Sequence, residues 1–438
     1  MSLPTIHVEI DFANGPSFGY PLILDSLSYG ILGLNILGDV PADVVDITAQ
    51  VRKVSTRRGR NRLLSQFEAG TATVTINDPN SYFSPENTSS PYYGKLKPLR
   101  KIRIYAEVEV ASVIETVPIF AGYITSYDTT FYQGTNEDAT VTLQCVDAFR
   151  LLANVATGIP AVPGTFSGQF SGFRVDSLLQ FAGFPDSMSL LDPGNSAMQA
   201  DPGGNRSVLQ AIQTIEQSEF GGFFVSRAGK VIFLDRDTIA KRANSAPREY
   251  SDILPLAAGV YPYRFVDFAF DDQLILNKVT VSTLGNSPVT VEDPASIETY
   301  FTKSGQRLDL LMLNNSESLD QAQTILAARK DAKLRVNSMT VDLLAPVSEE
   351  NTFENLSMDI YTLVNVTRTM PGGSVVTIEL FCQGVNHDIT PTNWNMTVFT
   401  AEPLIQAFIL DAGPADNPNS QGVLAEMSPV PNTNALSY

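Results

Sequence analysis

The residues best suited to chemistry in this chain are its two histidines. His7 lies in the first strand-like run, and His387 is followed directly by Asp388. A catalytic histidine needs a nucleophile within hydrogen-bonding reach, and a metal-binding histidine needs further ligands at a suitable spacing. The sequence contains no H-E-x-x-H or G-x-S-x-G motif and no recognisable Cys–His pairing. We therefore predict neither a catalytic nor a metal-binding role for the two histidines.

Acidic pairs are the other candidates for chemistry. Asp271 and Asp272 are adjacent, and Asp235 and Asp237 are two residues apart, so either pair could act as general acid and base. Because the chain has 47 acidic residues, most of them must be solvated, and we predict the same for these four. Residues 77–87 are rich in oxygen ligands but lack the D-x-D-x-D-G spacing of a calcium loop. We predict no catalytic, cofactor-binding or metal-binding residue, no cofactor and no enzymatic activity.

The formal net charge of −18 argues against one class of partner. A protein binds a phosphate backbone by replacing counterions with Lys and Arg, and this chain has only 29 basic residues against 47 acidic ones. We therefore expect no specific binding of nucleic acid, although DNA could pass a surface of this charge without adhering to it. The apolar fraction of 43% is ordinary for a globular protein, and 438 residues are enough for about three domains.

The N-terminus and the cysteines indicate where the chain folds. MSLPTIHVEI lacks the basic region and apolar run of a signal peptide, and no stretch of the chain reaches the roughly 20 apolar residues of a membrane span. We therefore expect folding in a reducing cytoplasm. Cys145 and Cys382 both lie in strand-like runs, where we predict buried free thiols; a disulfide between them is the alternative.

Residues 57–105 form the most informative stretch of the chain. A basic cluster opens it, consisting of Arg57, Arg58, Arg60 and Arg62. Residues 71–76 then alternate apolar side chains with threonine, as in a half-buried strand. The next segment is rich in Pro, Asn, Asp and Ser, which favour an ordered excursion over a flexible linker. A second alternating strand at 101–105 ends the stretch, which contains no catalytic constellation.

This stretch resembles the minor tail proteins of long-tailed bacteriophages, best known from phages that infect actinobacteria. The resemblance rests on the pattern G-R-x-x-x-L-x-x-F/Y-E-A-G-T-A-T-V-T-L/I-x-N/D, read here from Gly59 to Asp78. A second pattern, P-E-N-T-S-S-P-Y-Y-G-x-L-x-P, is read from Pro85 to Pro98. Weaker similarities to hub proteins or to the same family follow at 173–237, 293–300 and 384–398.

The resemblance implies a fold and a place in the virion. The expected fold class is α+β, mainly β: a multidomain baseplate hub with two tail-tube-like antiparallel β-barrels and an intervening α+β domain. We divide the chain into an N-terminal tube-like barrel domain (1–155), an α+β hub domain (156–245), a second tube-like β domain with inserted helices (246–395) and a C-terminal extension (396–438). The protein would be made in the host cytoplasm and located at the tail tip of the virion.

Local signals predict several element ends. Helices are expected at 175–182, after Asp147, from Ser207 to Gly221–Gly222, from Asp293–Pro294 to Tyr300, and from Ser318 onward. Turns are expected at Asn14–Pro16, Gln133–Asn136 and Pro371–Gly373. After Tyr300, the resembled family more often has Gly, whereas this chain has Phe301, so we expect a different local turn. Residues 407–411 and 422–425 are short apolar strips that could dock on another protein.

The motif T-[V/I]-x-L-x-C occurs twice, at Thr140–Cys145 and Thr377–Cys382, each time in the second arm of a predicted hairpin. It indicates either an internal duplication or a chance similarity between two β-rich segments. Tail tubes in the resembled family are sixfold rings, so a chain with two barrels could cap such a ring as a homotrimer. The resemblance implies contacts with the distal tail protein, the tape measure protein and other tail-tip or receptor-binding proteins, with DNA passing through transiently.

Two other functions stay open at this point. The chain could be a tail-associated receptor- or carbohydrate-binding protein, with Tyr92 and Tyr93 as exposed aromatic residues, or a cell-wall hydrolase. We also expect the basic islands at 57–62 and 95–103 to contact an acidic face of another protein; solvated loops are the alternative. The acidic excess would line the channel for DNA, although solubility alone also explains it.

Overall fold

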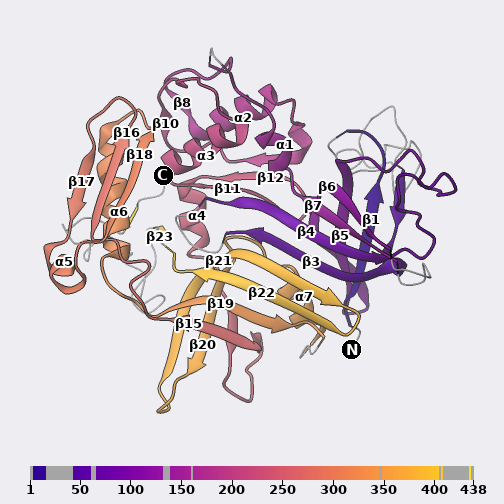
Figure 1. Ribbon diagram of the computed structural model, residues 1–438. Coiled ribbons are helices and arrows are strands. Elements are labelled where there is room, and N and C mark those ends of the chain that lie inside the picture. The colour runs from indigo at the N-terminus through magenta and orange to yellow at the C-terminus, as the bar shows by residue number, and fades with distance from the viewer. Residues whose placement is uncertain are drawn as a thin grey trace.

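The computed structural model describes residues 3–15, 43–60, 66–131, 139–158, 161–344, 348–403, 406–407 and 434–435. Several predicted features lie outside these ranges: Pro16, Arg62, the turn at Gln133–Asn136, the strip at 422–425 and most of the strip at 407–411. The rest of the chain forms a large twisted sheet, a helical lobe and a small satellite unit (Figure 1).

One 14-stranded sheet crosses the molecule in the order β14-β13-β20-β21-β3-β4-β7-β6-β5-β1-β2, with β22, β19 and β15 branching from β21. Its N-terminal strands are β1 (Thr5–Asp11), β2 (Val44–Asp46), β3 (Val51–Gly59), β4 (Glu68–Asn77), β5 (Arg100–Val110), β6 (Val113–Thr130) and β7 (Thr140–Val146). Its C-terminal strands are β13 (Arg248–Ser251), β14 (Val260–Tyr261), β15 (Phe265–Ala269), β19 (Arg335–Asp342), β20 (Leu363–Thr369), β21 (Val375–Thr390) and β22 (Asn393–Ala401).

The long strand β21 joins the two halves of this sheet. Its first half pairs with β20, and its second half pairs with both β22 and β3. In the β3–β21 register Gly59 lies opposite Gly384. Gly59 has φ +90°, and a Cβ there would lie 2.3 Å from the carbonyl oxygen of Gln383, so the close approach of the two strands requires glycine. The glycine that opens the tail-protein motif therefore has a structural role at this junction.

The two predicted closed barrels are not found among the described strands, which form open sheets. β3 pairs with β4 on one side and with β21 on the other, so neither of its edges is left to close a barrel with β1 or β2. The coarser prediction of an α+β, mainly β chain is confirmed. Within the sheet, β7 and β21 carry the two copies of the repeated motif, and whether these segments arose by duplication stays a prediction.

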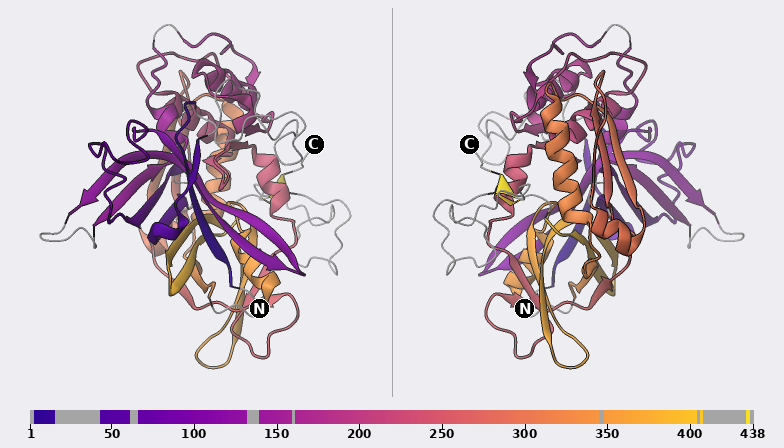
Figure 2. Two further views of the ribbon diagram at one scale, coloured as in Figure 1. Left: turned by 90° about the vertical axis from the view of Figure 1, so that its right-hand side faces the viewer. Right: turned by 90° about the vertical axis from the view of Figure 1, so that its left-hand side faces the viewer.

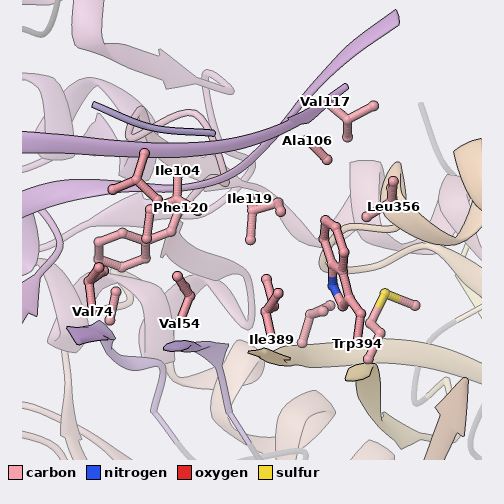
Figure 3. Close-up of a cluster of buried hydrophobic side chains, with 14 of the residues drawn as sticks. Val54, Val74, Ile104, Ala106, Val117, Ile119, Phe120, Leu356, Ile389 and Trp394 are labelled. Carbon is pink, nitrogen blue, oxygen red and sulfur yellow. The ribbon is translucent and has the colours of Figure 1, made fainter. Parts of the chain in front are cut away.

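A single hydrophobic core lies beneath both halves of the large sheet. Figure 3 shows Val54, Ile104 and Phe120 of the N-terminal half close to Ile389 and Trp394 of the C-terminal half. All five side chains are at most 4% exposed. Because each buried side chain of this kind contributes about 2 kcal/mol, the shared core helps to hold the two halves together.

The helical lobe lies above the sheet in Figure 1 and has a second core. It contains α1 (Phe149–Ala153), α2 (Ser171–Phe181), α3 (Val208–Glu219), α4 (Arg236–Arg242) and the strands β8 (Gln169–Phe170), β9 (Ser189–Leu191), β10 (Ala197–Met198), β11 (Gly222–Val225) and β12 (Val231–Leu234). Ser207 caps α3 as predicted, in a capping box with Gln210. The helix ends one residue before the predicted glycines, because Phe220 itself takes the left-handed conformation.

The satellite unit is built from β16 (Lys278–Thr283), β17 (Val289–Glu292), β18 (Ser304–Leu310), α5 (Pro294–Tyr300) and α6 (Asn315–Arg329). Figure 2 shows α6 beside this small sheet, where Ala322 and Ile325 pack on Val279 and Val281. Asp293 caps α5, and the helix ends at Tyr300, as predicted. The predicted start of α6 at Ser318 is wrong: the helix begins after Asn314, and Ser318 is buried within it.

The polar segment between β4 and β5 is ordered, as predicted. It forms consecutive turns in which the amides of Ser81, Ser84, Asn87, Ser90 and Tyr93 each donate to the carbonyl three residues earlier. The Asp78 carboxylate accepts from two further amides, and Phe83 is fully buried beneath the segment. Asp, Ser and Asn favour the first position of such turns, which explains the regular spacing. Outside these segments lie α7 (Glu349–Leu356) and the short pair β23 (Gln406–Ala407) and β24 (Asn434–Ala435).

Candidate functional site

His387 is buried inside the large sheet and does not form a catalytic pair. Its Nδ1 accepts a hydrogen bond of 3.2 Å from the Trp394 indole, so the neutral ring carries its proton on Nε2. Burial, aided by the charge of Arg58, lowers the pKa of His387 to about 3. Asp388 points to the opposite side of β21, where it is exposed and pairs with Lys53 at 3.3 Å. The adjacent histidine and aspartate therefore cannot act together.

His7 lies on the other side of the sheet, in a polar ladder between β1 and β5. It stacks on Tyr105 with ring centroids 5.0 Å apart and lies 3.3 Å from a Glu107 oxygen. Glu9 accepts from both Arg103 (2.6 Å) and Tyr105 (2.9 Å). Burial and the Glu9 hydrogen bond raise the pKa of Tyr105. A pocket of about 350 Å³ adjoins this ladder at Arg103 and Tyr105, but its charged residues already pair within the chain: Arg103 with Glu9, Glu107 with His7 and Arg227 with Asp359.

The prediction that the acidic pairs are solvated is wrong for Asp235. Asp235 is buried and caps α4 through a 2.8 Å hydrogen bond from the Thr238 amide. Asp271 pairs with Arg335 at 2.7 Å, and Asp272 pairs with Lys303, whose hydrogen bond and charge lower the aspartate's pKa. In the described ranges, no group of three or more His, Cys, Asp or Glu side chains is placed to hold a metal ion.

Cys145 and Cys382 are both buried and free, as predicted. Burial raises the pKa of both thiols, to about 12 for Cys382, so neither has the depressed pKa of a reactive cysteine.

Among the helices that the structure describes, none is both long and apolar enough to cross a membrane.

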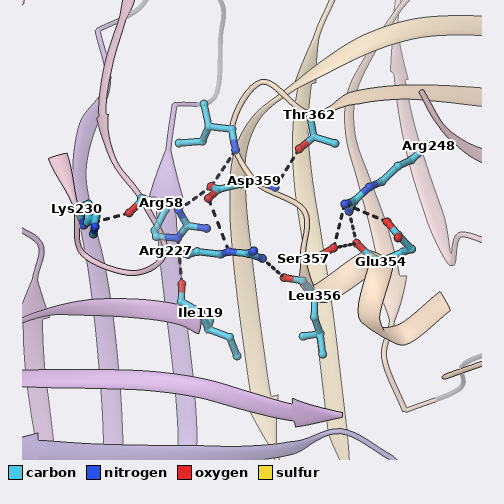
Figure 4. A network of polar contacts seen from close by, with 12 residues as sticks. Arg58, Ile119, Arg227, Lys230, Arg248, Glu354, Leu356, Ser357, Asp359 and Thr362 are labelled. Carbon is cyan, nitrogen blue, oxygen red and sulfur yellow. Dashed lines mark hydrogen bonds and ion pairs between the residues drawn. The ribbon is translucent and has the colours of Figure 1, made fainter. Parts of the chain in front are cut away.

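The first basic island is largely internal, and the prediction of a contact surface there is wrong for Arg58 and Arg60. Arg58 is 4% exposed; its guanidinium donates to the Ile119 carbonyl (3.1 Å) and to Asp359 (3.0 Å). Figure 4 shows Arg227 on the other side of Asp359, donating to the Leu356 carbonyl. The cluster therefore ties β3 to β6, to the β11–β12 turn and to the segment after α7.

Arg60 completes this junction beneath the helical lobe. Its guanidinium donates to Gln383 (2.8 Å) and to the Tyr361 hydroxyl (3.0 Å) and lies 4.2 Å from the centre of the Phe67 ring. Glu216 of α3 is buried nearby, and burial raises its pKa to about 7 despite the opposing charge of Arg60. The sequence could not reveal this burial, because Gln383, Tyr361 and Glu216 are far from Arg60 along the chain and only Phe67 is close to it.

The second basic island is divided between the interior and the surface. Lys101 is 3% exposed and pairs with the fully buried Asp11 at 2.7 Å, so it too is unavailable to a partner protein. Lys95 and Lys97 are exposed, and Lys95 pairs with Asp43 at 2.7 Å. Only the part of this island in the loop before β5 fits the prediction of a contact surface.

Exposed aromatic residues form the remaining candidate surfaces. Tyr93 is 54% exposed, as the carbohydrate-binding alternative requires, but Tyr92 is half-buried against Phe12 and Phe83. Sequence reasoning missed a larger group in and before α2, where four phenylalanines are 43% to 64% exposed: Phe166, Phe170, Phe173 and Phe181. The spacing of the last three over one helix face was the signal that could have revealed them.

Comparisons with known proteins identify a shared fold. No protein-family model matches the sequence, and no curated protein matches it significantly. A tail protein from Neisseria meningitidis MC58 superposes with a TM-score of 0.54 at 12% identity, over 92% of this chain and 97% of that chain. The 43 kDa tail protein of prophage MuSo2 from Shewanella oneidensis superposes with a TM-score of 0.52 at 13% identity, over 83% and 96%. The chain therefore has the fold of phage tail proteins over nearly its whole length.

Proposed function

We propose that this protein is a structural, non-enzymatic component of a bacteriophage tail, located at the tail tip as the hub that continues the tail tube. The observation that carries the proposal is the likeness of nearly the whole chain to the Neisseria tail protein. The minor-tail-protein motif at 59–98 supports it independently, since its residues build β4, the turn segment and the glycine junction with β21. The burial of His387 supports the absence of hydrolytic activity.

Three copies would form the hub ring. In place of two closed barrels, each copy would contribute the two halves of one sheet, so three copies would present six half-sheets to a sixfold tube. The edge strands β2, β14 and β15 each pair with only one described strand and are available at the boundaries between copies. The ring would contact the distal tail protein, the tape measure protein and receptor-binding proteins. An acidic wall would let DNA pass without binding it.

Electron cryo-microscopy of assembled tails tests the proposal. We expect three copies of this chain around the axis at the distal end of the tube, with Asp and Glu enriched on the channel wall. Six copies, or one copy off the axis, would refute the hub ring, and absence of the chain from the tail would refute the tail function. Turnover of host cell-wall glycan or peptide by the purified protein would contradict the non-enzymatic assignment.

A further inference from the structure

Helix α2 buries one apolar face and exposes phenylalanines on the other. Its inner face buries Val175 and Leu178 completely in the core of the helical lobe. Its outer face carries Phe173 and Phe181, which are 56% and 43% exposed, and Phe170 at the N-cap, which is 47% exposed. Between Phe173 and Phe181 the helix also carries polar residues, including Asp176 and Gln180, which form a 2.9 Å hydrogen bond. Several large apolar side chains exposed close together in one segment mark a candidate protein–protein contact.

The same surface is held rigidly. Arg174 points inward from α2 and is fully buried; it donates to the Gln169 side chain (2.6 Å) and to the Phe166 carbonyl (2.7 Å). These bonds fix the segment before α2 beside the helix, so that the 64% exposed Phe166 joins the others. We call Phe166, Phe170, Phe173 and Phe181 the aromatic face. A preorganised face loses little conformational entropy on binding.

Charge restricts what can cover the aromatic face. Residues 161–205 contain four aspartates and a single basic residue, the buried Arg174. Asp201 is buried and pairs with Arg206, whereas Asp186 is exposed and Asp176 is partly exposed, so two aspartates make the neighbourhood of the face acidic. Two copies that met through this face would bring like charges together, which opposes a twofold contact. The matching surface must combine exposed apolar side chains with lysine or arginine.

The loop before β5 has this combination. Residues 91–99, which we call the lysine loop, expose Tyr93 (54%) and Leu99 (43%) beside Lys97. Lys95 is exposed too but pairs with Asp43 at 2.7 Å, so Lys97 is the cation that this loop offers. The loop is anchored from below, because Leu96 is only 8% exposed and the Tyr92 ring packs on Phe83. It is therefore a rigid surface of the chemistry that the aromatic face requires.

We propose that the aromatic face of one copy packs against the lysine loop of the next copy. In Figure 1 the aromatic face belongs to α2 at the top of the molecule, whereas the lysine loop leads into β5 on its right side. Two different, complementary surfaces on one chain produce a head-to-tail contact, which closes into a ring if the rotation permits. The closed ring of three copies rests on the proposed function, whereas the pairing of the two surfaces does not.

Cross-linking between variants of the full chain that each gain one exposed cysteine tests the pairing. Gln180→Cys places a thiol at the edge of the aromatic face, and Pro98→Cys places one in the lysine loop; Cys145 and Cys382 are buried and do not compete. With a short bismaleimide we expect the mixed dimer to form at least tenfold faster than either self-dimer. The control pair combines Gln180→Cys with Thr302→Cys on the satellite unit, where we expect only background cross-linking.

Charge-reversal variants test whether opposite charges determine that these two surfaces pair. Lys97→Glu in the Pro98→Cys variant should reduce the mixed cross-link at least fivefold, and Asp176→Lys in the Gln180→Cys variant should restore it. Arg52→Glu, an equal charge change at an exposed position elsewhere, should have no effect. A mixed cross-link no faster than the control pair, or a faster Gln180→Cys self-dimer, overturns the pairing while leaving the tail-tip location intact. Conversely, a strong cross-link in a protein absent from the tail would refute only the proposed function.

Discussion

Arg58 lies almost completely inside the molecule, whereas Phe173 of α2 and Phe170 at the N-cap of this helix face solvent. The two regions thus reverse the usual distribution of charged and aromatic side chains. Around Arg58, the cost of burying a charge is offset within the chain by Asp359 and the Ile119 carbonyl. On the outer face of α2 nothing in the described chain offsets the exposure of the phenylalanines. The comparison teaches that the buried arginine serves the fold, whereas the exposed phenylalanines contribute little to it and are free for the contact proposed above.

The largest expected effect is on the buried side of this comparison. Arg58→Ala should lower the free energy of unfolding by about 3–5 kcal/mol, because it leaves Asp359 and the Ile119 carbonyl without their shared donor. The matched control is Arg57→Ala, whose ion pair with Glu68 is solvated and should be worth less than about 1 kcal/mol. Urea unfolding followed by Trp394 fluorescence measures both values. Equal losses for the two variants would contradict the internal role of Arg58.

The two faces of α2 give the next test. Leu178→Ala should cost about 3 kcal/mol, because it opens a cavity in the core of the helical lobe. Phe173→Ala, on the outer face, should change the stability of the isolated chain by less than about 0.5 kcal/mol. The same unfolding measurement applies. A large loss for Phe173→Ala would mean that its ring supports the fold and not an interface.

Glu216 tests how strongly a buried carboxyl group makes the free energy of unfolding depend on pH. Its folded pKa of about 7 exceeds the ordinary 4.5, so between these values the folded state holds more protons than the unfolded state. This group alone therefore makes stability fall as pH rises from 4.5 to 7, by on the order of 3 kcal/mol. Glu216→Gln should remove that fall in unfolding experiments at several pH values. His387 acts in the opposite direction: its depressed pKa of about 3 makes stability fall as pH drops below 6.5.

The smallest expected effect concerns an exposed aromatic residue away from α2. Phe301 is 83% exposed and has φ 60° and ψ 173°, a conformation that essentially only glycine adopts without strain. Phe301→Gly should raise the free energy of unfolding by about 1 kcal/mol, after the entropic cost of glycine is subtracted. Phe265→Gly, at an exposed strand position, is the control and should be destabilising. A destabilising Phe301→Gly would show that the ring contributes to the fold.

Short-range features were predictable from the sequence. Asp293–Pro294 and Tyr300 bound α5, and Ser207 caps α3, because these signals act within one helical turn. The ordered segment between β4 and β5 was predictable for the same reason. The failure at Ser318 is instructive: Gln321 there donates to the Ser218 carbonyl on α3 instead of forming a capping box, so a tertiary contact replaced the local one.

The sequence by itself determined the local elements, the mainly β composition and the resemblance to tail proteins, because propensity, turn chemistry and motifs act over a few residues. Only the tertiary structure decided that β3 pairs with β21 across more than 300 residues, which merges the two expected barrels into one open sheet. The same tertiary structure places Asp359 beside Arg58, so this arginine of the basic run is buried and paired within the chain. Strand order and burial depend on such distant partners, which no local pattern encodes.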